Sequence, residues 1–248
     1  MSSSRRHSAA AKRIPLLVDL RATGEVPVIP ISSDDYRFVG NPDGYRHRKL
    51  LGPDGKTYLF KAQQERRGFR LSAPRVQIAV YRLAKSLGVD TPIVHHVILD
   101  GREGSLQEWR QAETPSPNRA GMRRLNITAD PRSLYEMAVL DAITGEPDRH
   151  ASNYLVDPDD GHVIAIDNDL AFNGRMFWQV SRAGGEATNL IRRLLPHRGE
   201  LVAAVTPLLT HGELAMLRFR LKAMPLAAMR EARAASRDAL KDAVPTIA

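Results

Sequence analysis

Short apolar runs separated by turn sequences dominate the chain from about residue 35 to residue 99, and this pattern predicts strands. The strands expected here are Tyr36–Val39, Tyr45–Leu51, Thr57–Ala62 and Ile93–Leu99. The first two are separated by Gly40–Gly44, and Gly52–Gly55 precedes the third. Glycine-containing turns between apolar runs are typical of β-hairpins.

One helix interrupts these strands. Apolar residues recur at helical spacing over Val76–Leu87, Pro74 suits the first turn, and Ser72 is the expected N-cap. Gly88 is placed to end the helix. We expect its apolar stripe to form lobe core and to have no chemical role.

The second half of the chain has a mostly helical pattern. Asp130 and Pro131 mark the start of a helix that Gly145 ends. A hairpin with strands Tyr154–Asp157 and His162–Ile166 follows, and residues 199–243 are helical by pattern.

This order of elements predicts an α+β, two-lobed protein, with a strand-rich N-terminal lobe and a mostly helical C-terminal lobe. Residues 1–20 are expected to be a basic, disordered tail. The N-terminal lobe would then cover residues 21–109 and the C-terminal lobe residues 110–248.

Composition sets limits on location and chemistry. The 248 residues are 43% hydrophobic, which is enough for a sizeable core. There is no cysteine, which excludes disulfides, thiolate metal sites and thiol nucleophiles. No apolar run approaches the ~20 residues that span a bilayer, and the N-terminal tail lacks the apolar segment of a Sec signal. The expected location is the cytoplasm, and delivery into a host or target cell would also suit the tail.

The net charge of +8 raises the question of an anionic partner. Seven basic residues face three acidic ones between residues 218 and 242. A phosphoinositide or an anionic membrane would suit this stretch, and a solvated helix face is the plainer interpretation. Nucleic acid is not expected, because aromatic residues are scarce and not interleaved with the basic runs. The oligomeric state has no sequence signal.

Candidate chemistry gathers around the second-half hairpin. The midpoint of Asn153 and Asp167 falls inside its turn, so an antiparallel pairing would set these two residues side by side. Asp148 lies in the loop before the first strand. Carboxylate and amide oxygens of this kind suit Mg²⁺. Asp and Asn also occur simply as turn residues, which explains Asp159 and Asp160 better than residues that flank strands.

The segment Asp148–Asn153, with the order Asp-Arg-His-x-x-Asn, resembles the catalytic loop of the phosphatidylinositol 3/4-kinase superfamily. The segment Ile166–Phe172 is most similar to type II phosphatidylinositol 4-kinases and to HipA-type bacterial protein kinases. The resemblance covers roughly residues 39–172. It implies a kinase-like fold and an ATP-dependent phosphotransferase that uses Mg²⁺ or Mn²⁺.

The resemblance also implies roles for single residues. Asp148 would position or deprotonate the acceptor hydroxyl, and His150 would support the loop or contact the transferred phosphoryl group. Asn153 and Asp167 would bind the metal, with Asp169 as a further ligand.

Nucleotide binding is implied for the first half. Lys61 stands where the strand-borne ATP lysine belongs. Gly104–Trp109, which includes Gln107, resembles the hinge that binds adenine through its backbone, and Gly40 to Gly44 takes the place of the glycine-rich phosphate loop. The alternative for Lys61 is an ordinary strand lysine, and the alternative for Gly40 to Gly44 is a plain hairpin turn.

One position departs from the kinase pattern. Kinases pair the ATP lysine with a Glu on the following helix, but Gln77 stands there. Glu65 is nearer in sequence to Lys61 and could substitute. Because Gln77 cannot neutralise a lysine, the resemblance also admits nucleotidyl transfer, such as AMP transfer.

A Ser/Thr hydroxyl of a protein is the acceptor expected first, since the chain has neither a palmitoylation cysteine nor an evident lipid-inserting segment. A phosphoinositide is the second. The hypothesis from another class is a non-catalytic protein, either a pseudokinase or a basic binding module. Gln77 favours the pseudokinase, whereas the complete set of Asp148, Asn153 and Asp167 opposes it.

Overall fold

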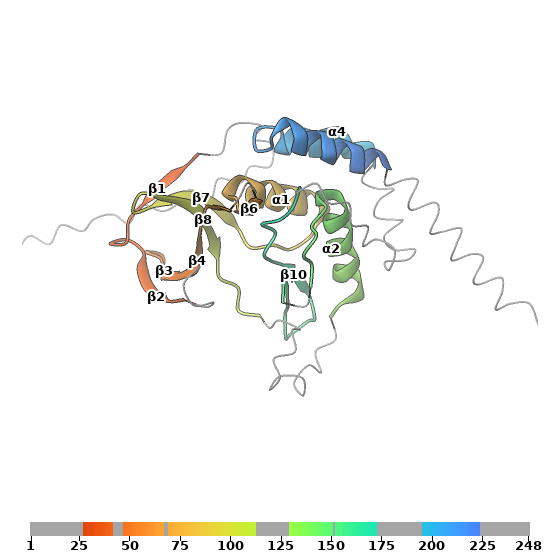
Figure 1. Cartoon of the computed structure of the whole chain (residues 1–248). Coiled ribbons are helices and arrows are strands. Elements are labelled where there is room, and N and C mark those ends of the chain that lie inside the picture. The colour runs from red at the N-terminus through yellow and green to blue at the C-terminus, as the bar shows by residue number, and fades with distance from the viewer. Residues whose placement is uncertain are drawn as a thin grey trace, which may run out of the picture.

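The computed structural model describes residues 27–41, 47–66, 69–112, 129–150, 152–172 and 195–223. A strand-rich part from the first half of the chain adjoins a part with helices from the second half, and α1 lies between the sheet and α2 (Figure 1). The predicted α+β, two-lobed fold is confirmed. The expected tail over residues 1–20 lies outside the described residues, and the boundary at residue 109 stays a prediction.

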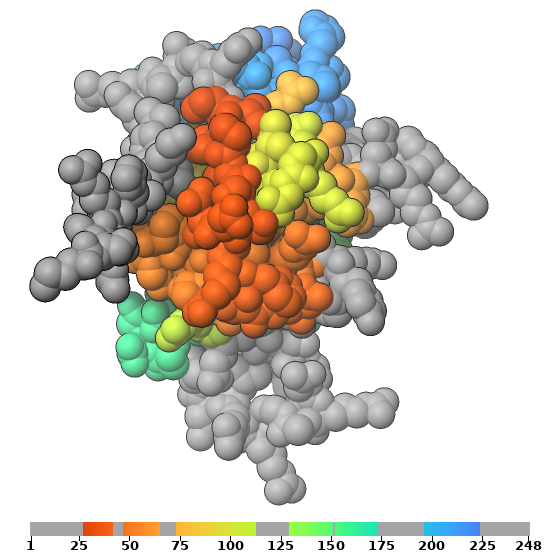
Figure 2. Space-filling view, turned by 90° about the vertical axis from the view of Figure 1, so that its left-hand side faces the viewer, coloured from red at the N-terminus to blue at the C-terminus, as the bar shows by residue number. Residues whose placement is uncertain are grey.

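Six strands form one sheet in the order β1-β7-β8-β4-β3-β2. Their bounds are Ile29–Ile31 for β1, Arg37–Gly40 for β2, His47–Leu51 for β3, Thr57–Ala62 for β4, Val94–Leu99 for β7 and Arg102–Glu108 for β8. β1 and β7 are parallel, and the other neighbours are antiparallel. Residues of β1 to β3 lie at the front of the face shown in Figure 2. A separate pair comprises β5 (Gln64–Arg66) and β6 (Phe69–Ser72).

The segment Gly104–Trp109, which resembles a hinge in sequence, lies largely in the inner strand β8, which pairs with both β4 and β7. Its role as a hinge stays a prediction. Small and polar residues hide its strand character in the sequence. Gly104 is required by a close approach, because a Cβ atom there would lie 2.5 Å from the Lys61 carbonyl oxygen and 2.6 Å from the Phe60 ring.

Helix α1 (Pro74–Leu87) begins one residue later than its predicted cap allows. Ser72 ends β6, where it pairs with Gln64, and the N-cap is Ala73, which makes no side-chain cap. Gly88 ends the helix in the left-handed conformation, with φ of 76°, as predicted. Packing between the sheet and the second half buries α1 on most sides, and this compensates for the missing cap.

The helix predicted after Asp130 is confirmed as α2 (Pro131–Thr144). The Asp130 side chain accepts hydrogen bonds from the Arg132 and Ser133 N–H groups, and Gly145 ends the helix with φ of 65°. A hairpin follows, formed by β9 (Tyr154–Val156) and β10 (Val163–Ala165). A short 3₁₀ turn, η2 (Leu195–His197), leads into α4 (Arg198–Val205), and residues 211–223 are helical.

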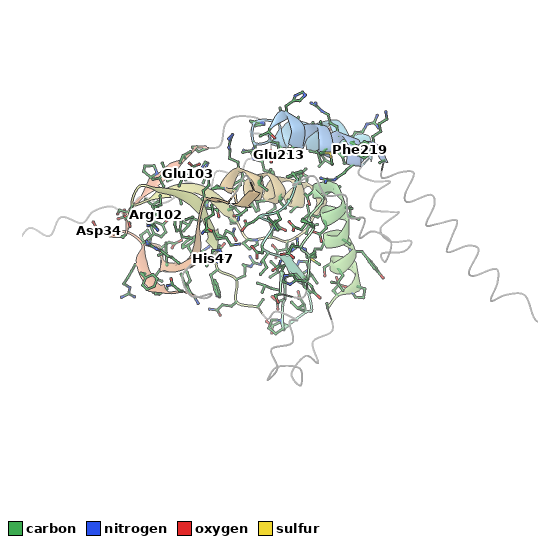
Figure 3. The ribbon with its side chains drawn as sticks, in the orientation of Figure 1. Asp34, His47, Arg102, Glu103, Glu213 and Phe219 are labelled. Carbon is green, nitrogen blue, oxygen red and sulfur yellow. The ribbon has the colours of Figure 1, made fainter. Side chains whose placement is uncertain are left out.

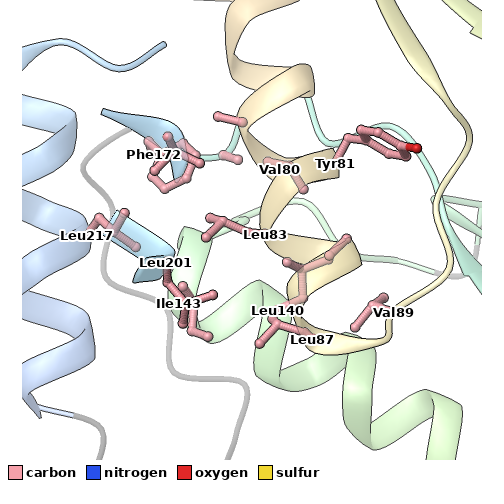
Figure 4. Packing of buried hydrophobic residues seen from close by; sticks show 14 of the residues in the cluster. Val80, Tyr81, Leu83, Leu87, Val89, Leu140, Ile143, Phe172, Leu201 and Leu217 are labelled. Carbon is pink, nitrogen blue, oxygen red and sulfur yellow. The ribbon is translucent and has the colours of Figure 1, made fainter. Parts of the chain in front are cut away.

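Two hydrophobic clusters stabilise the fold. The smaller lies within the sheet and comprises Tyr36, Leu50, Tyr58, Phe60, Val97, Leu99 and Leu106. The larger joins α1 to the second half, where Leu83 of α1 lies near Ile143 of α2 and Leu201 of α4 (Figure 4). Since α1 packs into the second half, the larger cluster contains residues of both parts, whereas the smaller belongs to the sheet alone. Within the described residues, no helix is long and apolar enough to cross a membrane.

Candidate active site

Lys61 links the two parts of the chain. It lies on β4 with only 3% of its surface exposed. Its Nζ atom donates to Asp167 Oδ1 at 2.5 Å and to Asp169 Oδ2 at 3.3 Å, both in the segment after β10. A buried ammonium group is costly unless it is paired. These two carboxylates therefore stabilise Lys61, which is more than an ordinary surface lysine of a strand.

The three groups shift one another's ionisation. Burial lowers the pKa of Lys61, but the Asp169 and Asp167 carboxylates outweigh it and raise the pKa overall. Burial likewise opposes the charge on Asp167, yet Lys61 lowers the pKa of Asp167 below its ordinary value. Burial raises the pKa of Asp169 to about 6 in spite of Lys61. Asp169 Oδ1 has no hydrogen-bond donor among the described residues.

The hairpin register differs from the prediction by one residue. Ala165 pairs with Tyr154, and the Ile166 N–H donates to the Asn153 carbonyl at 3.3 Å, so Asn153 faces Ile166 rather than Asp167. Asp167 has a left-handed backbone, with φ of 56°. Aspartate tolerates this conformation better than most residues, and the turn it makes brings its carboxylate to Lys61.

Asp148, His150 and Asn153 lie together in the loop between α2 and β9. Asn153 Nδ2 donates to the Asp148 carbonyl at 2.8 Å and lies 3.4 Å from Asp148 Oδ2. His150 Nε2 lies 3.8 Å from the same carboxylate, and its Nδ1 accepts from the Ser152 N–H at 3.2 Å. The Asp148 side chain is 54% exposed, which makes it accessible to an acceptor substrate.

Arg149 organises the site, although the sequence did not single it out. It is buried and makes a forked ion pair with Asp141 of α2, with distances of 2.9 to 3.2 Å. Its other donors reach the carbonyl of Ile166 at 2.6 Å, the carbonyl of Asn153 and the side chain of Asn168. One guanidinium therefore ties α2, the Asp148 loop and the Asp167 segment together. Its place between two predicted site residues was the only sequence signal.

Glu146 also escaped the sequence interpretation. It is 2% exposed, and its Oε1 atom accepts from the Asp148 N–H at 3.0 Å. Burial raises its pKa to about 7. The two residues before Glu146 are held by the buried Arg220, which donates to the Thr144 carbonyl at 2.8 Å and packs over Gly145. These contacts fix the start of the Asp148 loop.

Several groups of the residues predicted to bind adenine make contacts with other residues of the protein. Gln107 Nε2 donates to Gln77 Oε1, and the Trp109 N–H donates to the Thr57 carbonyl at 2.8 Å. The Trp109 ring lies 4.2 Å from Lys49 Nζ in a cation–π contact. The Trp109 N–H is therefore engaged, and adenine binding by Gln107 and Trp109 stays a prediction.

The expected phosphate loop and Gln77, which stands at the position of the kinase glutamate, both depart from the kinase pattern. Gly40 ends β2 at a register shift, with φ of 153°, whereas Gly44 lies outside the described residues. Gln77 of α1 accepts a hydrogen bond from Gln107 and is not an ion-pair partner of Lys61. The carboxylates that pair with Lys61 belong to the segment after β10. The side chain of Glu65 is not among those described.

The donor set fits a hard cation that is completed by substrate oxygens. Among the described residues, no group of three or more His, Cys, Asp or Glu side chains could hold a metal by itself. The site instead offers two carboxylates, Asp167 and Asp169, and the amide of Asn153. Mg²⁺ is typically bound through one or two carboxylates, with phosphates and water completing the shell.

A strand lysine paired with two aspartates after a hairpin, with a third aspartate in the loop before that hairpin, defines a protein of the kinase-like class. The family model for phosphatidylinositol 3- and 4-kinase matches residues 72–231, which is more than half of the chain, so the chain belongs to this family. Lys61 precedes the matched residues.

A solved structure shows the same fold. The Helicobacter pylori proinflammatory kinase CtkA is similar to this chain with a TM-score of 0.57 and 11% sequence identity, over 83% of this chain and 98% of that one. At this identity the likeness concerns the fold alone. No curated protein matches the sequence.

Proposed function

We propose that this protein is an ATP-dependent phosphotransferase that phosphorylates Ser/Thr hydroxyls of a protein substrate. The observation that carries the proposal is the buried contact of Lys61 with Asp167 and Asp169. It joins the sheet of the first half to a segment of the second half, which Arg149 ties to the Asp148 loop by donating to the Ile166 and Asn153 carbonyls. Family membership supports a phosphotransferase as the general class.

The transfer needs an acceptor hydroxyl aligned with the γ-phosphoryl group. In the proposed step, a bond forms between the acceptor oxygen and the γ-phosphorus, and the bond to ADP breaks. Asp148 is the group placed to accept the hydroxyl proton, because its carboxylate is exposed while Glu146 and Asn153 fix its backbone. Catalysis of this kind depends mostly on positioning and charge neutralisation.

Lys61, Asn153 and Asp167 are the groups proposed to act on the phosphates. Lys61 would turn from its carboxylates to the phosphate oxygens when ATP binds. Asn153 Nδ2 donates to Asp148, so its Oδ1 is the atom proposed as a metal ligand, together with the Asp167 and Asp169 carboxylates. A bound Mg²⁺ would supply charge neutralisation of the phosphates.

A protein acceptor is favoured over a lipid one by the chain itself. It contains no cysteine for palmitoylation. The family name keeps phosphoinositide as the second acceptor, and the basic stretch between residues 218 and 242 would suit a lipid headgroup.

Transfer from γ-labelled ATP tests both acceptors. The wild-type protein is incubated with Mg²⁺, ATP and either a mixture of proteins or phosphatidylinositol vesicles. We expect label in protein, released by acid hydrolysis as phosphoserine or phosphothreonine. Asp148→Asn should lower the rate by about 10² to 10⁴, the usual contribution of a general base.

If only the lipid is labelled, the protein acceptor is wrong and the phosphoinositide is the substrate. Equal labelling by the wild type and by Asp148→Asn would contradict the role of Asp148. If no acceptor is labelled although ATP raises the melting temperature, the protein binds nucleotide without catalysis, as a pseudokinase would.

A further inference from the structure

A second basic side chain stands beside Lys61 on the neighbouring strand. The register of β3 and β4 sets His47 directly opposite Lys61. Opposed residues of an antiparallel pair project from the same face of a sheet, with Cβ atoms about 5 Å apart. His47 therefore projects from the face on which Lys61 reaches Asp167. In Figure 3, His47 lies on the side of the sheet that faces the β9–β10 hairpin.

The same face of the sheet carries the contact to the carboxylate. Lys61 Nζ donates to Asp167 Oδ1 at 2.5 Å, and His47 is the residue directly opposite Lys61 on β3. His47 and Lys61 thus form a pair of nitrogen donors on adjacent strands, facing the proposed metal ligand. A phosphate group that bridges a metal at Asp167 and the Lys61 ammonium would lie within reach of both.

The sequence of the segment Gly40–Gly44, which precedes β3, is poor in phosphate donors. Glycine-rich loops bind phosphates through their backbone N–H groups. The segment Gly40–Gly44 contains Pro42, which has no N–H, and Asp43, whose charge repels phosphate. A side-chain donor shortly after this segment would supply what it lacks. His47 is the first described residue after it and lies opposite Lys61.

We propose that His47 binds the phosphate chain of the nucleotide together with Lys61, by donating a ring N–H to a phosphate oxygen. A neutral imidazole carries one N–H and a charged one carries two, so a donor is present in both states. The inference rests on the proposed use of ATP and adds a phosphate ligand to it. His47 binds and orients the phosphates in this account and takes no proton from the acceptor.

Binding measurements without turnover test this assignment. The full chain is titrated by calorimetry with MgADP, with a non-hydrolysable ATP analogue and with adenosine. His47→Gln should weaken MgADP and the analogue about tenfold, the effect of one lost charge-assisted hydrogen bond. Adenosine, which has no phosphate, should bind the variant and the wild type equally.

Arg48→Gln is the matched control, because Arg48 pairs with Phe60 and projects from the opposite face of the sheet. It should leave all three affinities unchanged. His47→Lys keeps a donor and a positive charge, and should bind MgADP nearly as tightly as the wild type. Melting temperatures of the variants identify any that fail to fold.

Two results would overturn the inference alone. In the first, the wild type binds MgADP and His47→Gln binds it equally well. In the second, His47→Gln loses MgADP and adenosine to the same extent, which would indicate a structural role. A wild-type protein that binds neither nucleotide would overturn the proposed function itself, and the inference with it.

Discussion

At the scale of single residues, the site is held by buried charges that partner one another. Arg149 is enclosed by Asp141, two backbone carbonyls and the Asn168 side chain, and Lys61 by two carboxylates. Removing one member of such a group leaves the other charge buried and unpaired, which is strongly destabilising. These residues therefore determine both the stability and the geometry of the site.

Sequence alone identified some of these residues and missed others for a physical reason. Asp148, Asn153 and Asp167 flank strands at a spacing that the chain itself shows. Arg149 gains its partners only when α2 packs against the hairpin. Likewise, the pairing of Lys61 with Asp167 spans 106 positions, and only the kinase resemblance hinted at it.

Glu146 gives a prediction for stability against pH. Its pKa rises from the ordinary 4.5 to about 7 in the folded protein. Between these values the unfolded chain has lost the proton that the folded protein keeps, so stability falls as pH rises and the loss is complete above pH 7. Glu146→Gln removes this loss, and should be more stable than the wild type by roughly 3 kcal/mol at pH 8.

Urea unfolding of both proteins at pH 4 and pH 8 measures this difference. At pH 4 the wild-type side chain is protonated in both states, so the two proteins should have similar stabilities. A stability difference that is the same at both pH values would show that Glu146 does not titrate as described.

At the scale of elements, the sequence predicted the helices well and the hairpin register less well. Proline and glycine mark the ends of α1 and α2, and both left-handed glycines occur where they were expected. The predicted register was wrong because the Asp157 N–H donates to the His162 carbonyl, which sets the centre of the turn between two residues. The prediction had placed the centre on a single residue. A shift of one residue cannot be recognised from a short, fully apolar pair of strands.

Strand β8 was not recognised as a strand in the sequence for a related reason. Its Gly104, Ser105 and Gln107 give it neither the apolar alternation nor the β-branched residues of a typical strand. It is an inner strand because β4 and β7 pair with it, which is a tertiary effect.

The two helix-ending glycines differ in what surrounds them, and this gives a second prediction. A Cβ atom at Gly145 would lie 2.1 Å from the Arg220 guanidinium, whereas a Cβ atom at Gly88 would meet nothing within 4 Å. Gly88→Ala should cost about 1 kcal/mol, from the left-handed backbone alone. Gly145→Ala should cost about 3 kcal/mol, because Arg220 must also leave the Thr144 carbonyl.

Chemical denaturation of the two variants beside the wild type provides the comparison. Equal losses of stability at the two positions would mean that Arg220 moves aside without cost. In that case its buried position would not hold the end of α2.

At the scale of the whole molecule, α1 makes the two parts of the chain one folding unit. By sequence α1 lies between β6 and β7 of the first half, but its buried side chains belong to the larger cluster, which it shares with the second half. Arg82 of α1 also donates to the carbonyl of Ala204 in α4 at 2.8 Å. The site lies where these parts meet, so its geometry depends on their packing.

A single unfolding transition is therefore predicted. Leu83 and Leu99 are both buried, in the larger and the smaller cluster respectively. Leu83→Ala and Leu99→Ala should each destabilise by about 2–5 kcal/mol. Both should shift the same calorimetric transition, with calorimetric and van't Hoff enthalpies that agree. Two transitions, of which each variant moves only one, would show that the parts unfold independently.

The central claim is that the site transfers the γ-phosphoryl group of ATP. The most direct measurement is ³¹P NMR of the wild-type protein with ATP, Mg²⁺ and a mixture of acceptor proteins, beside Asp167→Asn. The account predicts ADP and a new phosphate-ester signal, with a rate at least about a hundredfold lower in the variant. Pyrophosphate in place of ADP would mean nucleotidyl transfer, and ATP that stays intact with the wild type would contradict the account.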